Sequence, residues 1–109
     1  MERIICSAIW YKELPRTIDA RGFQPINTDS GIVVCGLRHG NCIATVKELS
    51  NLRTVKLAPD GVGESVQGFL TNLNRFVDRT EARQIALTAG QIDDNNTQSK
   101  IKLYSEDLY

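Results

Sequence analysis

The 109-residue chain contains one histidine, His39, and one tryptophan, Trp10, and only 6% of its residues are aromatic. A single histidine excludes any metal site or catalytic pair that needs two histidines from one chain. Thirteen basic and thirteen acidic residues cancel to a net charge of zero. This balance argues against a general duplex-binding protein, because such proteins carry a basic excess across one face.

Long hydrophobic runs and dense cysteines are also missing. No apolar segment approaches the roughly 18 residues of a membrane span, and the opening MERIIC has no basic stretch typical of a signal peptide. The three cysteines, Cys6, Cys35 and Cys42, are odd in number and widely spaced, which is typical of reduced thiols in a reducing compartment. We therefore expect a cytoplasmic protein without membrane contact, and a single domain spanning residues 1–109.

Apolar patterning predicts several short strands. Segments rich in isoleucine and valine predict buried strands over residues 2–10 and 31–37. Two more strands are predicted, one at 52–58, closed by a Pro-Asp-Gly turn at 59–61, and one at 64–71, where Gly68 marks a bulge or a close backbone approach. Polar and turn-forming residues predict a loop or an irregular hairpin at 15–30, which contacts the core through Ile18 and Phe23, and a loop at 93–99. The final IKLYSEDLY predicts a last short strand.

Two helices are predicted from apolar residues at helical spacing. The first follows a turn at 36–41 and ends near residue 50. The second covers residues 79–89 and has clear ends, with Asp78 as N-cap, Glu81 completing a capping box and Gly90 as the stop. Strands outnumber helices and the βαβ alternation is missing, so we predict an α+β fold, a mostly antiparallel sheet packed with two helices.

A glycine-bearing turn, GLRHGN, joins the predicted strand at 31–37 to the first helix. Backbone N–H groups at a helix start bind anions, the glycines allow close approach, and Arg38 supplies a fork for phosphate beside His39. The same residues also suit a purely structural turn in which Asn41 caps the helix. Both interpretations stay open at this stage.

A second pattern is the series Arg75, Arg79 and Arg83, which recurs every four residues with Phe76 beside it. Guanidinium groups and a flat ring together suit a pyrophosphate and an adenine. The alternative is that the arginines pair with nearby acids such as Glu81, each surface contact contributing about 0.3–0.5 kcal/mol.

The remaining candidates for chemistry are weaker. His39 lies between Cys35 and Cys42, and Cys6 could complete a Cys3His zinc site, but the spacing lacks a C-x2-C pair and the thiols lie in apolar runs that favour burial. The adjacent acids at 106 and 107 point to opposite faces of an extended segment and so do not share a substrate. Nothing orients His39 as a catalytic base. We predict no metal, no cofactor and no enzyme activity, hence binding without turnover.

The segments ICSAIWYKELP, GLRHGNCI, QGFLTNLNRFVDRTEARQIALTAGQ and LYSEDLY resemble the first family of phage Thoeris anti-defence proteins. The similarity covers most of the chain outside residues 16–30 and 93–100, and the first of these is an insertion relative to shorter members. This resemblance implies α+β dimers that act as a sponge. They bind a glycocyclic ADP-ribose signal made by bacterial TIR-domain enzymes and keep it intact, so that the Thoeris effector is never activated.

The same resemblance implies the site and the partners. Its motifs NRFVDR and GLRHG give the expected ligand-binding residues Arg38, His39, Asn74, Arg75, Phe76 and Arg79. It also implies a homodimer or higher homo-oligomer in the cytoplasm of the infected bacterial host, with cyclic oligonucleotides at a separate site in some members. Two alternatives stay open, an enzyme that hydrolyses a nucleotide or ADP-ribosyl signal through His39, and a single-stranded nucleic-acid-binding module that stacks bases on Phe69 and Phe76.

Overall fold

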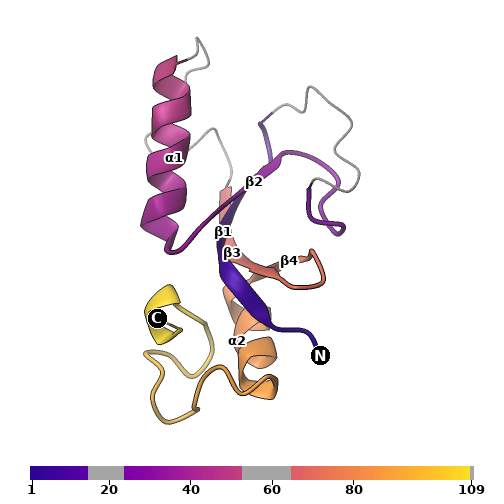
Figure 1. Cartoon of the computed structure of the whole chain (residues 1–109), viewed down its shortest axis with the longest axis vertical. Coiled ribbons are helices and arrows are strands. Elements are labelled where there is room, and N and C mark those ends of the chain that lie inside the picture. The colour runs from indigo at the N-terminus through magenta and orange to yellow at the C-terminus, as the bar shows by residue number, and fades with distance from the viewer. Residues whose placement is uncertain (15–23, 53–64, 109) are drawn as a thin grey trace.

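The computed structural model describes residues 1–14, 24–52 and 65–108 (Figure 1). One antiparallel sheet has the strand order β2-β1-β3-β4, so β1 and β3 are its central strands. The α+β prediction is confirmed. The elements follow one another as β1 (Ile4–Tyr11), β2 (Ile32–Gly36), α1 (His39–Leu52), β3 (Ser65–Thr71), β4 (Phe76–Asp78), α2 (Arg79–Thr88) and a short 3-10 turn, η1 (Ser105–Asp107).

One face of the sheet packs against the two helices. Successive side chains of a strand point to opposite faces, and this alternation places Ile9 and Phe69 on the helix side. Around Ile9, the core includes Tyr11 of β1 and Cys42 and Val46 of α1. Around Phe69, it includes residues of β4, α2 and the C-terminal segment, namely Val77, Ala82, Ala86 and Leu103. The two helices therefore cover different ends of the sheet, as Figure 1 shows.

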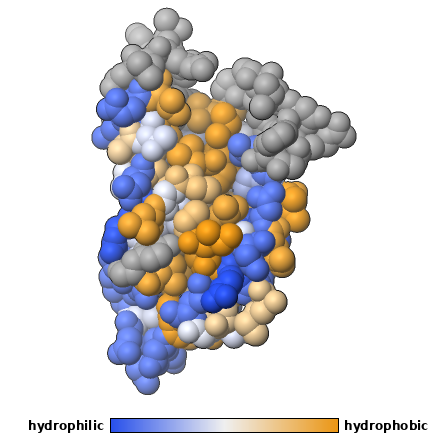
Figure 2. Space-filling model, in the orientation of Figure 1, coloured by the Kyte–Doolittle hydropathy of each residue, from blue (hydrophilic) through white to orange (hydrophobic). Residues whose placement is uncertain are grey.

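The opposite face of the sheet carries its own apolar cluster of Ala8, Val33 and Phe76. Residues 24–31 tie the two edge strands beside this cluster. The side-chain amide of Asn27 donates to the Phe76 carbonyl (2.6 Å) and accepts from the Phe76 N–H (2.8 Å), while Gln24 Oε1 accepts from the Val33 N–H (2.8 Å). These bonds satisfy backbone groups at strand edges that would otherwise be open to pairing with other chains. Figure 2 shows one face of the molecule, with an apolar band down its middle and mostly hydrophilic residues along both flanks.

The signals at the two ends of α2 are confirmed, although the Glu81 side chain accepts from Arg75 and no capping box forms with Asp78. The Asp78 carboxylate accepts from the Glu81 N–H at 2.8 Å, which makes Asp78 the N-cap. Gly90 has a positive φ of 73°, the left-handed conformation that ends a helix. Gly68 marks a close backbone approach, as predicted, because a Cβ there would lie 2.1 Å from the Val77 carbonyl oxygen.

Other predicted boundaries were wrong. α1 begins at His39, inside the predicted turn at 36–41, and runs through Leu52, where a strand was predicted to start. The strand predicted for IKLYSEDLY is instead an irregular segment ending in η1, because the Asp107 carboxylate accepts from the Tyr104 N–H and closes a helical turn. The rest of the predicted strand at 53–58, the turn at 59–61, and Ile18 and Phe23 lie outside the described residues.

Candidate functional site

The two helices begin next to each other on the helix side of the sheet. α1 starts at His39 and α2 at Arg79, and Arg79 Nη2 lies 3.4 Å from His39 Nδ1. The first turn of a helix presents unpaired N–H groups and the positive end of its dipole, so two helix starts together favour a negative charge. A Cβ built at Gly40, in the first turn of α1, meets no atom of the described residues within 4 Å, so this turn is open on that side.

The His39 side chain is buried and uncharged, and it supports Arg79. Its side chain packs edge-on against Phe69, with ring centroids 5.1 Å apart. Nε2 lies 2.8 Å from the Gly68 carbonyl oxygen, and because a carbonyl only accepts, Nε2 carries the proton and Nδ1 accepts from Arg79. Burial lowers the pKa of His39, and the charge of Arg79 lowers it further. Both ring nitrogens are therefore engaged by the protein, which does not suit a general base.

Uncharged groups of the protein hold the Arg79 guanidinium in place. Nη1 donates to the Leu103 carbonyl (2.9 Å), Nη2 donates to Gln67 Oε1 (2.6 Å), and the guanidinium carbon lies 4.6 Å from the centre of the Tyr104 ring. Burial lowers the pKa of Arg79, but a guanidinium stays charged in proteins. Because a carbonyl, an amide, an imidazole and an aromatic face carry no net charge, these contacts position the cation without neutralising it.

Arg38 and Glu106 form the outer edge of the site. Arg38 Nη1 lies 3.6 Å from Glu106 Oε1, and the two side chains are 39% and 55% exposed. Asn41 is not the N-cap that the sequence suggested, because α1 begins at His39 and Asn41 lies in its first turn. Its Oδ1 instead reaches back and accepts from the Arg38 N–H at 2.9 Å. A backbone N–H and the charges of Arg38 and Arg79 lower the pKa of Glu106. The arginine cluster, as we call Arg38, His39, Arg79, Tyr104 and Glu106, thus combines two cations, a neutral imidazole, a flat ring and one exposed carboxylate.

The structure does not bring the other three predicted residues into the arginine cluster. Phe76 lies on the opposite face of the sheet, where its ring contacts the Trp10 ring at a centroid distance of 5.7 Å and is nearly fully buried. Asn74 forms the β3–β4 turn with a positive φ of 57°, and its side chain donates to the Gln24 carbonyl. Neither side chain points toward Arg79, so spacing in the sequence did not translate into proximity.

Arg75 is engaged by the acids of its own chain. Nε and Nη2 donate to the two oxygens of Glu2 at 2.8 and 2.9 Å, and Nη2 also donates to Glu81 at 2.9 Å. The hydroxyl of Thr71 donates to the same Glu2 carboxylate at 2.7 Å. This bidentate geometry ties the N-terminal segment to the start of α2.

The Glu2 carboxylate should make stability depend on pH. Hydrogen bonds from Arg75 and then Thr71 lower the pKa of Glu2 below its ordinary value of 4.5. A carboxyl with a lowered folded-state pKa stabilises the fold above its ordinary pKa, and that contribution is lost as the pH falls through the folded-state value. We expect Glu2→Gln to destabilise the protein at pH 7 and to destabilise it less at about pH 3, as measured by urea unfolding at both pH values. An equal loss at both pH values would contradict this assignment.

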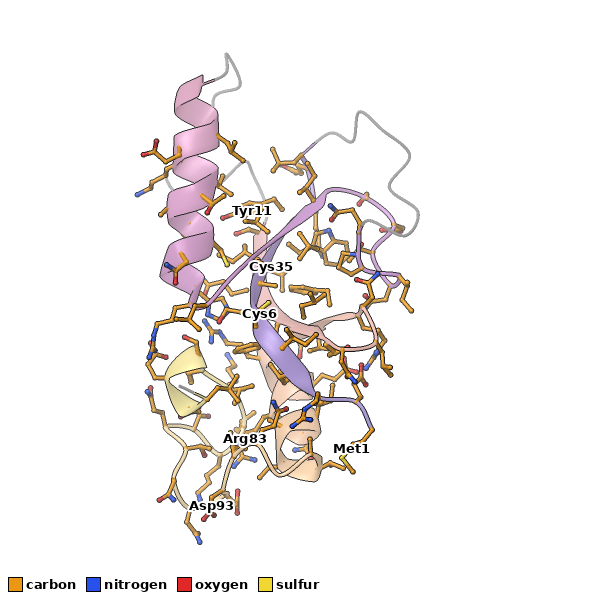
Figure 3. The ribbon with its side chains drawn as sticks, viewed as in Figure 1. Met1, Cys6, Tyr11, Cys35, Arg83 and Asp93 are labelled. Atoms are coloured by element: carbon orange, nitrogen blue, oxygen red, sulfur yellow. The ribbon has the colours of Figure 1, made fainter. Side chains whose placement is uncertain are left out.

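Arg83, the third arginine of the series, has a structural role. Its side chain is only 3% exposed; Nη2 contacts Asp94 at 2.5 Å and Nε donates to the Ser99 carbonyl at 3.0 Å. In Figure 3 it extends from α2 toward the loop that carries Asp93. Arg83 therefore fastens the polar loop at 93–99 to the helix. The same contact lowers the pKa of Asp94.

The comparisons with known proteins give the family. A model of the phage T4 y16D protein family matches residues 3–109. The chain belongs to this phage protein family. The match includes both motifs that supply the predicted ligand-binding residues. No curated protein and no solved structure matches the chain.

Within this phage family member, the described residues 1–14, 24–52 and 65–108 contain no group of three His, Cys, Asp or Glu side chains able to hold a metal ion. No helix among them is long and apolar enough to cross a membrane. The predicted ligand-binding residues did not include Tyr104 and Glu106 of the arginine cluster, nor Gln67, which contacts Arg79. The repeated tyrosines of LYSEDLY were a usable signal for Tyr104, whereas Gln67 is one polar residue in a strand and gave none.

Proposed function

We propose that this protein is a phage anti-defence sponge. It binds a glycocyclic ADP-ribose signal made by bacterial TIR-domain enzymes and does not cleave it, so the Thoeris effector is not activated. The observation that carries the proposal is the arginine cluster, in which Arg38 and Arg79 stand beside the Tyr104 ring at two converging helix starts. Membership of a phage family supports the proposal, as does the resemblance of the motifs.

The groups of the arginine cluster suit the groups of this ligand class. A pyrophosphate takes hydrogen bonds from a guanidinium fork and from backbone N–H groups at a helix start. An adenine stacks on a tyrosine ring or on a guanidinium plane. Gln67, which already meets Arg79, can turn its amide toward a ribose hydroxyl. Glu106 is the one group with the wrong charge, and we expect it to compete with the ligand for Arg38.

A sponge must outcompete an effector for a scarce signal, which requires at least nanomolar affinity, about −12 kcal/mol. Small ligands reach such affinity in rigid, enclosed sites. Arg38 and Glu106 are partly exposed, so one chain leaves this side of the site open. We therefore propose a homodimer or higher homo-oligomer whose second copy adds a wall, acting in the cytoplasm of the infected bacterial host. Any cyclic oligonucleotide would occupy a separate site.

The geometry favours this proposal over both alternatives. A hydrolase acting through His39 needs a free ring nitrogen, but one contacts the Gly68 carbonyl and the other contacts Arg79. A single-stranded nucleic-acid-binding module needs exposed aromatic faces, but Phe69 and Phe76 are 0% and 5% exposed.

A release experiment tests the proposal. The protein is incubated with a glycocyclic ADP-ribose, passed through a filter that retains protein, then denatured by heat and filtered again. We expect the intact signal to be missing from the first filtrate and to reappear in the second, as identified by mass spectrometry. A hydrolysed product would favour the enzyme, and free signal in the first filtrate would overturn binding itself. Native mass spectrometry of the loaded protein gives the number of chains and bound ligands.

A further inference from the structure

The three cysteines occupy different surroundings. Cys42 lies on α1 and is fully buried, with its sulfur near the carbonyl oxygens of Ser7 and Arg38. Cys6 on β1 is half-buried, and Cys35 on β2 is exposed. Cys42 is therefore shielded, while the other two thiols belong to neighbouring strands with access to solvent.

Strand register places Cys6 and Cys35 on one face of the sheet. β1 and β2 are antiparallel and pair Ala8 with Cys35. Cys6 lies two residues before Ala8, so its side chain points to the same face and is the diagonal neighbour of Cys35 across the two strands. Each of the two thiols shifts the pKa of the other, in opposite directions. Figure 3 shows the two side chains close together, one on each strand.

Surroundings also give the thiols different reactivities. The Cys35 thiol and the Gly36 backbone N–H lower the pKa of Cys6, which favours the thiolate, the nucleophile in thiol chemistry. The Cys6 thiol and burial raise the pKa of Cys35, the proton-bearing partner. Burial raises the pKa of Cys42 to about 11, so this thiol stays protonated.

We propose that Cys6 and Cys35 are a redox-active pair that closes to a cross-strand disulfide on meeting a peroxide. The Cys6 thiolate attacks one oxygen of hydrogen peroxide, which forms a sulfenic acid and releases hydroxide. Cys35 then attacks the Cys6 sulfur and displaces the sulfenic oxygen as water once the Cys35 proton is transferred. In sum, two thiols and one peroxide give one disulfide and two waters, and two electrons pass from sulfur to oxygen.

The position of Cys35 allows the bond to close. A disulfide requires the sulfurs to approach to about 2.05 Å, closer than in a hydrogen bond. β2 is an edge strand, and Cys35 is its second-last residue, so this strand end can move toward β1 without displacing a further strand. The bond would restrain the segment that leads, three residues later, to Arg38.

Tryptic mapping of the oxidised full-length protein tests the pair. Cleavage after Arg and Lys places the three cysteines in separate peptides, residues 4–12, 22–38 and 39–47. After treatment with a small molar excess of hydrogen peroxide, we expect the peptides 4–12 and 22–38 to be linked and Cys42 to be free. Three free thiols, or a disulfide that includes Cys42, would overturn the proposal.

Two variants sharpen the test. Cys35→Ser should stop at the Cys6 sulfenic acid, which dimedone traps, whereas Cys42→Ser should form the disulfide as the wild type does. A Cys35→Ser protein whose Cys6 does not react would overturn the assignment of Cys6 as nucleophile. If either variant fails to fold, as judged by circular dichroism, the mapping of the wild-type protein decides the outcome.

Discussion

Replacing Gly68 by alanine is expected to lower the free energy of unfolding by about 3 kcal/mol or more. A Cβ at this position would lie 2.1 Å from the Val77 carbonyl oxygen and 2.8 Å from the Phe76 ring. β4 cannot retreat without breaking the pairing of Gly68 with Asp78, and Asp78 is also the N-cap of α2. Urea unfolding monitored by circular dichroism measures the loss.

Gly40→Ala is the matched control for this substitution. Gly40 lies in the first turn of α1, where a Cβ meets no atom of the described part of the chain within 4 Å. Alanine is the better helix former, so stability should stay level or rise by up to about 1 kcal/mol. Wild-type stability in Gly68→Ala would mean that β3 and β4 are not packed this closely.

The sequence carried enough local information for α2, because its N-cap and stop signals act within a few residues of the helix. β4 was not predicted. Its three residues are too few for an alternating pattern. Its last residue, Asp78, indicates only a helix cap in the sequence. The C-terminal segment was misassigned because long-range contacts determine its conformation. Leu103 is held in this way, including by a hydrogen bond from its N–H to the Arg79 carbonyl.

The candidate site shows the same limit. A spacing of four residues places Arg75 and Arg79 on one side of a helix, but β4 lies between them and only Arg79 begins α2. Arg38 and His39 were placed correctly beside a helix start. Their proximity to Arg79 depends on how the sheet places α1 over β1 and β2 and α2 over β3 and β4, which no local pattern encodes. The choice of Glu2 as the partner of Arg75, 73 residues away, is equally a product of the folded chain.

Arg79→Ala is expected to weaken binding of a glycocyclic ADP-ribose by roughly 10- to 150-fold, which corresponds to about 1.5–3 kcal/mol for a charged hydrogen bond. The substitution removes the cation beside Tyr104 that neutral groups hold in place. Isothermal titration calorimetry of the wild type and the variant measures the change. Because Arg79 also donates to the Leu103 carbonyl, circular dichroism must first show that the variant is folded.

Glu106→Gln separates the charge of the arginine cluster from its packing. The substitution keeps the shape of the side chain but removes the carboxylate that faces Arg38 at 3.6 Å, so a ligand phosphate no longer competes with it. We expect affinity to rise a few-fold, opposite in sign to the effect of Arg79→Ala, and to rise less in high salt, where exposed charges are screened. Arg75→Ala is the third member of the comparison. If it abolishes binding while Arg79→Ala leaves affinity unchanged, the ligand lies at the β3–β4 turn, and the arginine cluster serves the fold alone.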